Sequence, residues 1–154
     1  MKRSRFDKSM DALSLGILVC TAVALAVLWR RLPDRIPLHY DFSGNITGYG
    51  GKASILIMPI ISALLYTVIS VAEHLPPESW NTGGIRVTHE NAEHVYTCLH
   101  HLLSSTKCIF IAFHTGITVC QALGSRLWIV PLLAEVLVCL VNIVFWTVKA
   151  KKHT

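Results

Sequence analysis

The residues best suited to bind a ligand lie in one polar stretch, residues 32–52, which separates two strongly apolar runs. Its prolines and glycines predict a structured loop with several turns, because they fix or widen the backbone angles. We expect Gly44 to need a positive φ. Seven residues of this stretch are candidates for ligand binding: Pro37, His39, Tyr40, Asp41, Gly44, Asn45 and Lys52.

Two interpretations of the polar side chains in this loop stay open. His39, Asp41 and Asn45 could together bind a cation or a headgroup, although one imidazole and one carboxylate are too few to predict a metal site. Alternatively, the loop caps itself, with these side chains bonded to nearby backbone groups as Asx turns. The demanding backbone implied by the prolines and glycines favours the self-capped loop.

A second set of polar residues lies inside the apolar runs, where an unpaired charge is costly. Lys107 and Glu135 are the two charges there, and we expect them to face inward. They do so either as a pair, coupled directly, through water or through His114, or each with His114 or Asn142. The predicted intramembrane polar seam joins the third and fourth helices and consists of Ser104, Lys107, His114, Glu135 and Asn142. It is either a proton or ion relay or a structural seam that locks two helices together.

Other kinds of chemistry find little support in the sequence. No nucleophile is accompanied by a base and an orienting group, so we do not expect an enzyme. The five cysteines lie in or beside apolar runs without a CxxC pair, which predicts free thiols. The histidines between residues 89 and 101 lack the spacing of a helical zinc pair. We therefore expect no cofactor and no metal.

The elements that position these residues are membrane helices. Hydrophobic residues make up 53% of the 154-residue chain and charged residues only 15%, against about 25% in a soluble domain. The apolar residues gather in four blocks, near 13–29, 53–72, 98–122 and 127–148. The sequence predicts a single all-α domain over 1–154, an integral membrane four-helix bundle with a structured extracytoplasmic loop between its first two helices.

The basic residues that give the chain its net charge of +5 lie mostly beside the apolar blocks. This placement indicates contact with membrane lipids and argues against nucleic acid as a partner. More Lys and Arg flank the side of the two termini and of residues 73–97 than the opposite side, so both termini are expected in the cytoplasm. Arg30, Arg31, Arg35 and Lys52 act against this orientation.

The loop sequence resembles the DUF1648 domain of bacterial membrane proteins. The resemblance rests on the run LPDRIPLHYDFSG, followed by Gly48 and Lys52, and on a second stretch with Thr88, Glu90, Asn91 and Tyr96, so it covers most of the chain. Asp41 stands where the family usually has Asn, and Thr47 where Asp is common.

The resemblance implies a location in the bacterial cytoplasmic membrane and a kinship with SdpI-like proteins, with immunity to a peptide toxin or signalling as the function. The partner would be such a toxin or another membrane protein. We therefore predict a binding module whose loop recognises an external ligand. The alternative is a small ion- or proton-coupled transporter that uses Lys107, His114 and Glu135.

Overall fold

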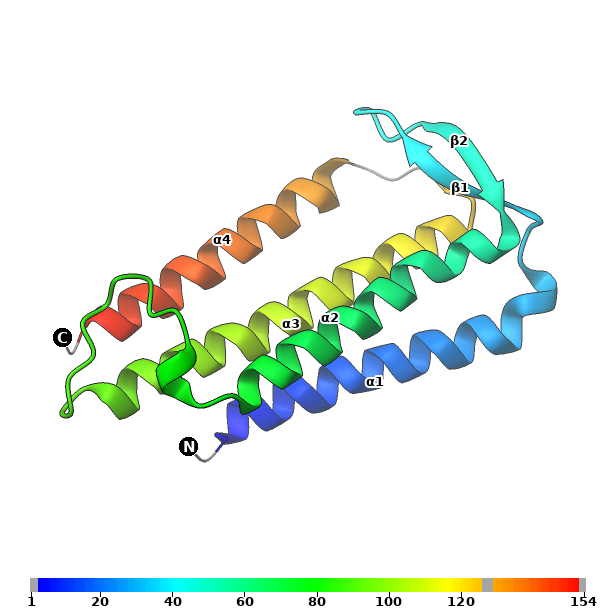
Figure 1. Ribbon diagram of the computed structural model, residues 1–154. Coiled ribbons are helices and arrows are strands. Elements are labelled where there is room, and N and C mark those ends of the chain that lie inside the picture. Colours follow the sequence, from blue (N-terminus) through cyan, green and yellow to red (C-terminus); the bar gives the residue numbers. More distant parts are fainter. Residues whose placement is uncertain (1–2, 126–128, 153–154) are drawn as a thin grey trace.

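Four long helices form the molecule in the computed structural model, which describes residues 3–125 and 129–152 but not the side chains at 129–132. They are α1 (Arg5–Leu28), α2 (Ile57–His74), α3 (Ala92–Ala122) and α4 (Ile129–Lys151). The helices α1, α2 and α4 each pack against α3, so α3 is the central helix (Figure 1). The predicted all-α class with four helices is confirmed, and a two-stranded sheet is added to it.

The distribution of side chains is that of a membrane protein. All four helices are long and apolar enough to cross a membrane, over Arg5–Arg31, Lys52–His74, Ala92–Ala122 and Leu133–Lys151. Apolar residues such as Val27, Leu64 and Leu137 are exposed, whereas Lys107 and Asp7 are buried. Polar groups turned inward and apolar groups turned outward are what a lipid environment favours. The chain is therefore a multi-pass membrane protein.

The first helix begins earlier than the apolar run that predicted it. Ser4 caps it, since its hydroxyl accepts a hydrogen bond from the Asp7 backbone N–H at 3.1 Å. The Asp7 carboxylate in turn accepts from the Ser4 backbone N–H at 2.9 Å, which completes a capping box. The polar residues before the apolar run consequently belong to the helix and share its faces.

The loop between α1 and α2 is mostly a β-hairpin, which the sequence analysis did not predict. The strands β1 (Arg35–Tyr40) and β2 (Ile46–Gly51) pair antiparallel. A Cβ at Gly48 would lie 2.8 Å from His39 Cδ2, so a larger residue here would require the exposed His39 ring to move. Proline and glycine are poor strand formers, and their abundance hid the strands.

The hairpin is fixed to one end of the bundle. Two short 3-10 helices, η1 (Trp29–Arg31) and η2 (Lys52–Leu56), connect it to α1 and α2. A small hydrophobic cluster lies beneath it, formed by Leu25, Leu32, Ile36 and Ile55. The side-chain Nε2 of Gln121 at the end of α3 also donates to the Pro37 carbonyl at 3.0 Å. The hairpin is thus held by the first and third helices together.

The opposite end of the bundle carries both ends of the chain and residues 75–91 (Figure 1). This segment includes the 3-10 helix η3 (Pro77–Ser79) and packs through Ile85 against α3 and α4. Its partners there are Val95, Cys98, Trp146 and Ala150. The fold therefore separates a hairpin end from a terminal end, as the four-span arrangement requires.

Candidate functional site

The turn of the hairpin is held by the carboxylate of Asp41. Its Oδ1 accepts from the backbone N–H groups of Ser43 and Asn45, each at 2.8 Å, and its Oδ2 accepts from Asn45 Nδ2 at 3.0 Å. Gly44 has a φ of 78°, so the expected positive φ is confirmed. The turn caps itself, as the second interpretation of this loop proposed. Among the described residues, no group of three or more His, Cys, Asp or Glu could hold a metal ion.

Phe42 is the side chain that this locked turn presents. It is 90% exposed, and Tyr49 on the following strand is 57% exposed. A rigid backbone that displays an unpacked aromatic residue is typical of a contact surface, because aromatic anchors bury a large area at low entropic cost. Phe42 was not among the predicted site residues, although an aromatic residue flanked by the turn residues Asp41 and Ser43 was a usable signal.

The other candidate residues divide between the hairpin surface and its base. His39 is exposed, whereas Pro37 is buried. The Lys52 ammonium lies over the Trp29 indole, 5.6 Å from the ring centroid. The Tyr40 hydroxyl is buried without a hydrogen-bond partner among the described residues, and desolvation raises the pKa of this phenol. Binding of a ligand by these residues stays a prediction.

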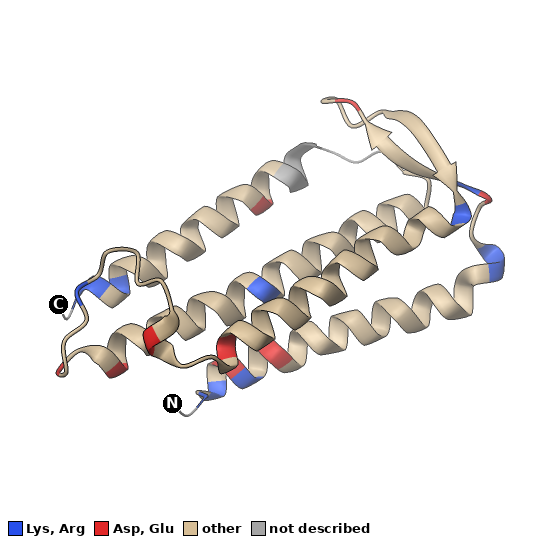
Figure 2. Cartoon of the chain, in the orientation of Figure 1, with Lys and Arg blue, Asp and Glu red and all other residues tan. Residues whose placement is uncertain are grey.

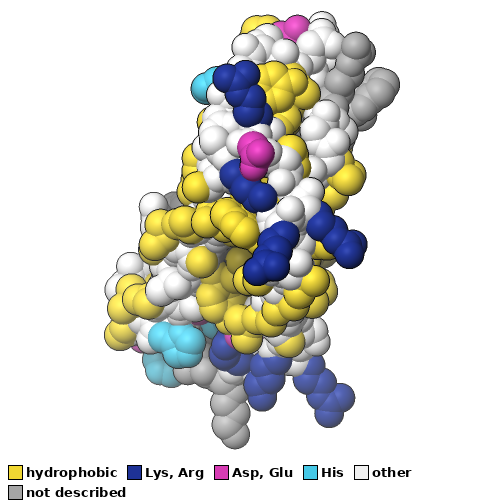
Figure 3. All heavy atoms as spheres, turned by 90° about the vertical axis from the view of Figure 1, so that its right-hand side faces the viewer, with side chains coloured by type: hydrophobic (Ala, Val, Ile, Leu, Met, Phe, Trp, Pro, Cys, Tyr) yellow, Lys and Arg dark blue, Asp and Glu magenta, His cyan; other side chains and the backbone are white. Residues whose placement is uncertain are grey.

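Basic side chains outnumber acidic ones over the hairpin end of the molecule, with hydrophobic side chains and an acidic side chain among them (Figure 3). Arg30 and Arg31 in η1 and Arg35 at the start of β1 are all exposed. A ligand that approaches the hairpin therefore meets positive potential next to aromatic surface.

A second polar site lies at the terminal end, centred on Lys107. We call it the ionic cluster, and it consists of Arg3, Asp7, Asp11, Glu73, His100, His101, Ser104 and Lys107. The ammonium of Lys107 is fully buried and donates to Asp11 Oδ1 at 2.7 Å and to Glu73 Oε2 at 2.9 Å. Acidic segments of α1 and α2 indeed lie side by side at this end of the bundle (Figure 2). The cluster therefore joins α1, α2 and α3.

The second half of the ionic cluster is built around Asp7. Its Oδ1 lies 2.6 Å from His101 Nδ1 and 3.3 Å from His100 Nδ1. The Ser104 hydroxyl connects the two halves, since it donates to Glu73 Oε1 at 2.8 Å and lies 3.3 Å from Asp7 Oδ1. Every carboxylate of the cluster thus has a basic group within 3.5 Å, and charges buried in this way are stable only when they are paired.

The prediction that Lys107 is coupled to Glu135 is wrong. The two carboxylates at Lys107 come from α1 and α2, and Glu135 has both oxygens buried without a hydrogen-bond partner among the described residues. The physical reason is the packing: α4 bonds to α3 at Ser105 and Thr106, whereas Lys107 on α3 bonds to α1 and α2. Asp11 and Glu73 were overlooked because both lie just outside the apolar runs.

The remaining seam residues link pairs of helices. Asn142 on α4 bonds to α3, accepting from Ser105 Oγ at 2.9 Å and donating to Thr106 Oγ1 at 3.0 Å. His114 on α3 bonds to α2, with its Nδ1 3.0 Å from Ser62 Oγ. Polar residues of α3 thus bond to both α2 and α4, and the α3–α4 seam runs through Ser105 and Thr106.

The comparison with protein families gives one match. Residues 16–63 match the family described as "Domain of unknown function (DUF1648)". This range contains most of α1, the whole hairpin and the start of α2, whereas the second stretch of the resemblance, residues 88–96, lies outside it. No curated protein and no solved structure matches the chain. The chain is therefore similar to this family over residues 16–63, and the hairpin with its self-capped turn lies near the middle of that range.

Proposed function

We propose that this protein is a bacterial membrane binding module whose hairpin recognises a ligand outside the cytoplasm. The observation that carries the proposal is the exposed Phe42 on a turn that Asp41 locks through three hydrogen bonds. A turn fixed before binding loses little conformational entropy when it meets a ligand. The hairpin also lies at the end of the bundle opposite the two termini (Figure 1).

The surface chemistry favours a peptide or a membrane-protein partner over a small polar solute. Phe42 and Tyr49 offer aromatic area, and β2 has no second strand beside it in the described sheet. An extended peptide can add to such a free strand edge and place an apolar side chain against the aromatic residues. With the SdpI-like resemblance, this supports immunity to a secreted peptide toxin as the biological role.

The test compares cells with and without the protein during exposure to a panel of membrane-active peptides. Cells that lack the protein should be more sensitive to at least one peptide, and the Phe42→Ser variant should fail to restore resistance at an equal expression level. Ser43→Ala is the matched control, because it changes an exposed residue of the same turn without removing apolar surface. Equal resistance with Phe42→Ser and with the unchanged protein argues against recognition through the hairpin.

Binding itself is measured with the active peptide, labelled with a fluorophore, and the purified protein in nanodiscs. Loss of a central aromatic anchor typically weakens an interface by about 2 kcal/mol or more, which is roughly 30-fold in Kd. We expect that loss for Phe42→Ser and less than two-fold for Ser43→Ala.

The alternative function, ion- or proton-coupled transport, has weaker support. Lys107 is neutralised by two carboxylates within 3 Å, and no hydrogen bond between described residues joins Glu135 to Lys107 or His114. A structural role for the ionic cluster is consistent with these contacts. Proteoliposome flux assays test the alternative: dissipation of a proton or cation gradient that Lys107→Met abolishes favours transport.

A further inference from the structure

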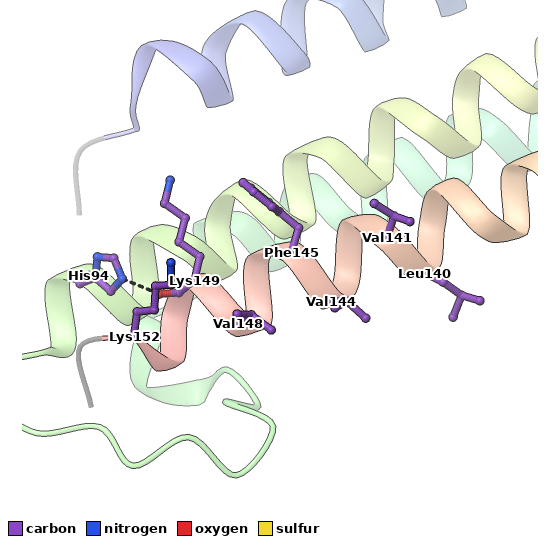
Figure 4. Close-up of a pocket in the computed structure, with 8 residues that line it drawn as sticks. All are labelled: His94, Leu140, Val141, Val144, Phe145, Val148, Lys149 and Lys152. Atoms are coloured by element: carbon purple, nitrogen blue, oxygen red, sulfur yellow. Dashed lines mark hydrogen bonds between the residues drawn. The ribbon is translucent and has the colours of Figure 1, made fainter.

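A long apolar groove runs along α4 and ends in a basic patch (Figure 4). Its volume is about 710 Å³, within the usual range of small-molecule sites. Apolar side chains of α4 between Leu140 and Val148 line most of it. At the terminal end of the bundle the lining changes to His94, Lys149 and Lys152.

The basic end of this groove is not matched by acidic side chains in the described part of the chain. Among those residues, no carboxylate lines the groove and no ion pair occupies Lys149 or Lys152. The Lys149 ammonium lies over the rings of Trp146 and Phe145, at 4.9 and 5.8 Å from their centroids, which keeps it beside the groove. His94 holds α3 to this end of α4 through the Lys149 carbonyl at 2.9 Å. The patch can therefore receive a negative charge.

The dimensions of the groove match one leaflet of a bilayer. From residue 140 to residue 152 a helix rises about 18 Å at 1.5 Å per residue. One leaflet contributes roughly 15 Å of hydrocarbon, half of the usual thickness. The lysines lie at the terminal end of a spanning helix, where headgroups are found, and the apolar part extends toward the middle of the membrane.

We propose that this groove is a binding site for one anionic phospholipid. The phosphate lies at Lys149 and Lys152, and an acyl chain follows the apolar side chains from Val148 to Leu140. A second copy of the chain fits less well, because a two-fold contact on this face would bring the same lysines of both copies together at one depth. The proposal is independent of the hairpin and of the side of the membrane on which the termini lie.

The first experiment measures lipid binding by the purified full chain in detergent, with native mass spectrometry. Phosphatidylglycerol and phosphatidylcholine of the same acyl composition are compared. We expect one phosphatidylglycerol to bind at least ten-fold more tightly than phosphatidylcholine. Equal affinity for the two lipids overturns the proposal. Glycerol phosphate, which has no acyl chain, should not displace the bound lipid, and efficient displacement would indicate an anion site without a lipid groove.

The charge arm of the test uses two lysines one residue apart. Lys152→Gln removes a charge that lines the groove, whereas Lys151→Gln removes the same charge from the same helix end outside the groove. An interfacial lysine contributes roughly five-fold to the affinity for an anionic lipid. We expect that loss for Lys152→Gln and less than a two-fold loss for Lys151→Gln. Equal losses indicate a diffuse surface effect and refute a built site.

The apolar arm fills the groove without changing any charge. Val144→Phe places a ring in the groove, and Val138→Phe makes the same change at an exposed position of α4 that does not line it. Val144→Phe should reduce the bound phosphatidylglycerol, and Val138→Phe should not. If Val144→Phe instead changes the oligomeric state and leaves lipid binding intact, the occupant is a second copy and the proposal fails.

Discussion

Among single residues, Lys107 is a fully buried cation whose charge is paired with two carboxylates. Its ammonium is removed from both water and lipid and is balanced by Asp11 and Glu73, while Ser70 Oγ accepts a further hydrogen bond at 3.1 Å and the Tyr66 ring lies 4.9 Å away. Replacement of one member of such a group leaves the opposite charges buried without compensation. The loss of stability on replacing Lys107 therefore depends on which of its charged partners remain.

Lys107→Met should lower the stability of the protein in detergent by about 3–5 kcal/mol, because Asp11 and Glu73 lose their buried cation and, among the described residues, keep only the more distant Arg3, at 3.3 and 3.4 Å. Thermal unfolding measures this as a fall in Tm. Lys8→Met is the matched control. Because Lys8 is exposed on α1, the Tm of this variant should stay close to that of the unchanged protein. Adding Glu73→Gln to Lys107→Met should recover part of the loss. Equal Tm values for Lys107→Met and Lys8→Met would show that the cluster contributes no stability.

Glu135→Gln should leave the Tm unchanged or raise it, because the carboxylate oxygens are buried without a partner among the described residues. Burial of an unsatisfied polar group costs about 1–3 kcal/mol, and the neutral amide reduces that cost. The double variant Lys107→Met, Glu135→Gln should show additive changes, since the two residues share no partner within the part of the chain that the structure describes. Mutual rescue in the double variant would instead restore the idea of coupled charges.

Among the elements, the hairpin depends on local bonds at its turn and on docking at its base. At the turn, the Asp41 carboxylate accepts hydrogen bonds from two backbone N–H groups. At the base, the fully buried Ile36 packs β1 beside η2 and the end of α3. The turn and the base can therefore be weakened separately. A substitution at the turn should loosen its tip and leave the four helices intact.

Asp41→Ala should increase hydrogen exchange at the amides of Ser43 and Asn45, both of which donate to its carboxylate. Gly44→Val should have a larger effect across the hairpin, because a β-branched residue at positive φ costs roughly 1–2 kcal/mol or more. Ser43→Ala is the control with little change expected. Exchange that is the same in all three variants would mean that the turn is held by other contacts.

The helices were predictable because lipid imposes a long apolar run, which is visible in a single sequence. The start of α1 was not, since Asp7 and Asp11 look like a polar flank until the capping box is seen. The partners of Lys107 were not predictable either. Spacing along one helix defines a face, such as the face of α3 that carries Ser104 and Lys107, but it does not define which neighbouring helix covers that face.

At the scale of the whole molecule, the hairpin and the ionic cluster lie at opposite ends of the helical bundle. The hairpin and the basic residues around it lie at one end, and the ionic cluster with both ends of the chain lies at the other (Figures 1 and 2). An orientation with the terminal end in the cytoplasm makes the hairpin accessible from outside the cell. The four helices keep these two regions apart by the thickness of a membrane.

Intact cells that carry Ser43→Cys should react with a membrane-impermeant thiol reagent, because residue 43 is exposed in the hairpin turn. His89→Cys, at the terminal end, should react only after the cells are opened. The unchanged protein is the control, because it measures the labelling of the five native free thiols. Labelling of residue 89 in intact cells, with none at residue 43, would reverse the orientation.

The ionic cluster also has a consequence for biosynthesis. Asp11 and Lys107 are 96 residues apart, so the acidic face of the first helix leaves the ribosome long before its basic partner exists. At about 5–20 residues per second, the delay is on the order of 5–20 s. During this time Asp11 lacks Lys107 and, among the described residues, has only Arg3 as a basic partner within ion-pair distance. Chains truncated before residue 107 should consequently be degraded faster than chains that extend beyond α3, and a pulse-chase experiment would measure the difference.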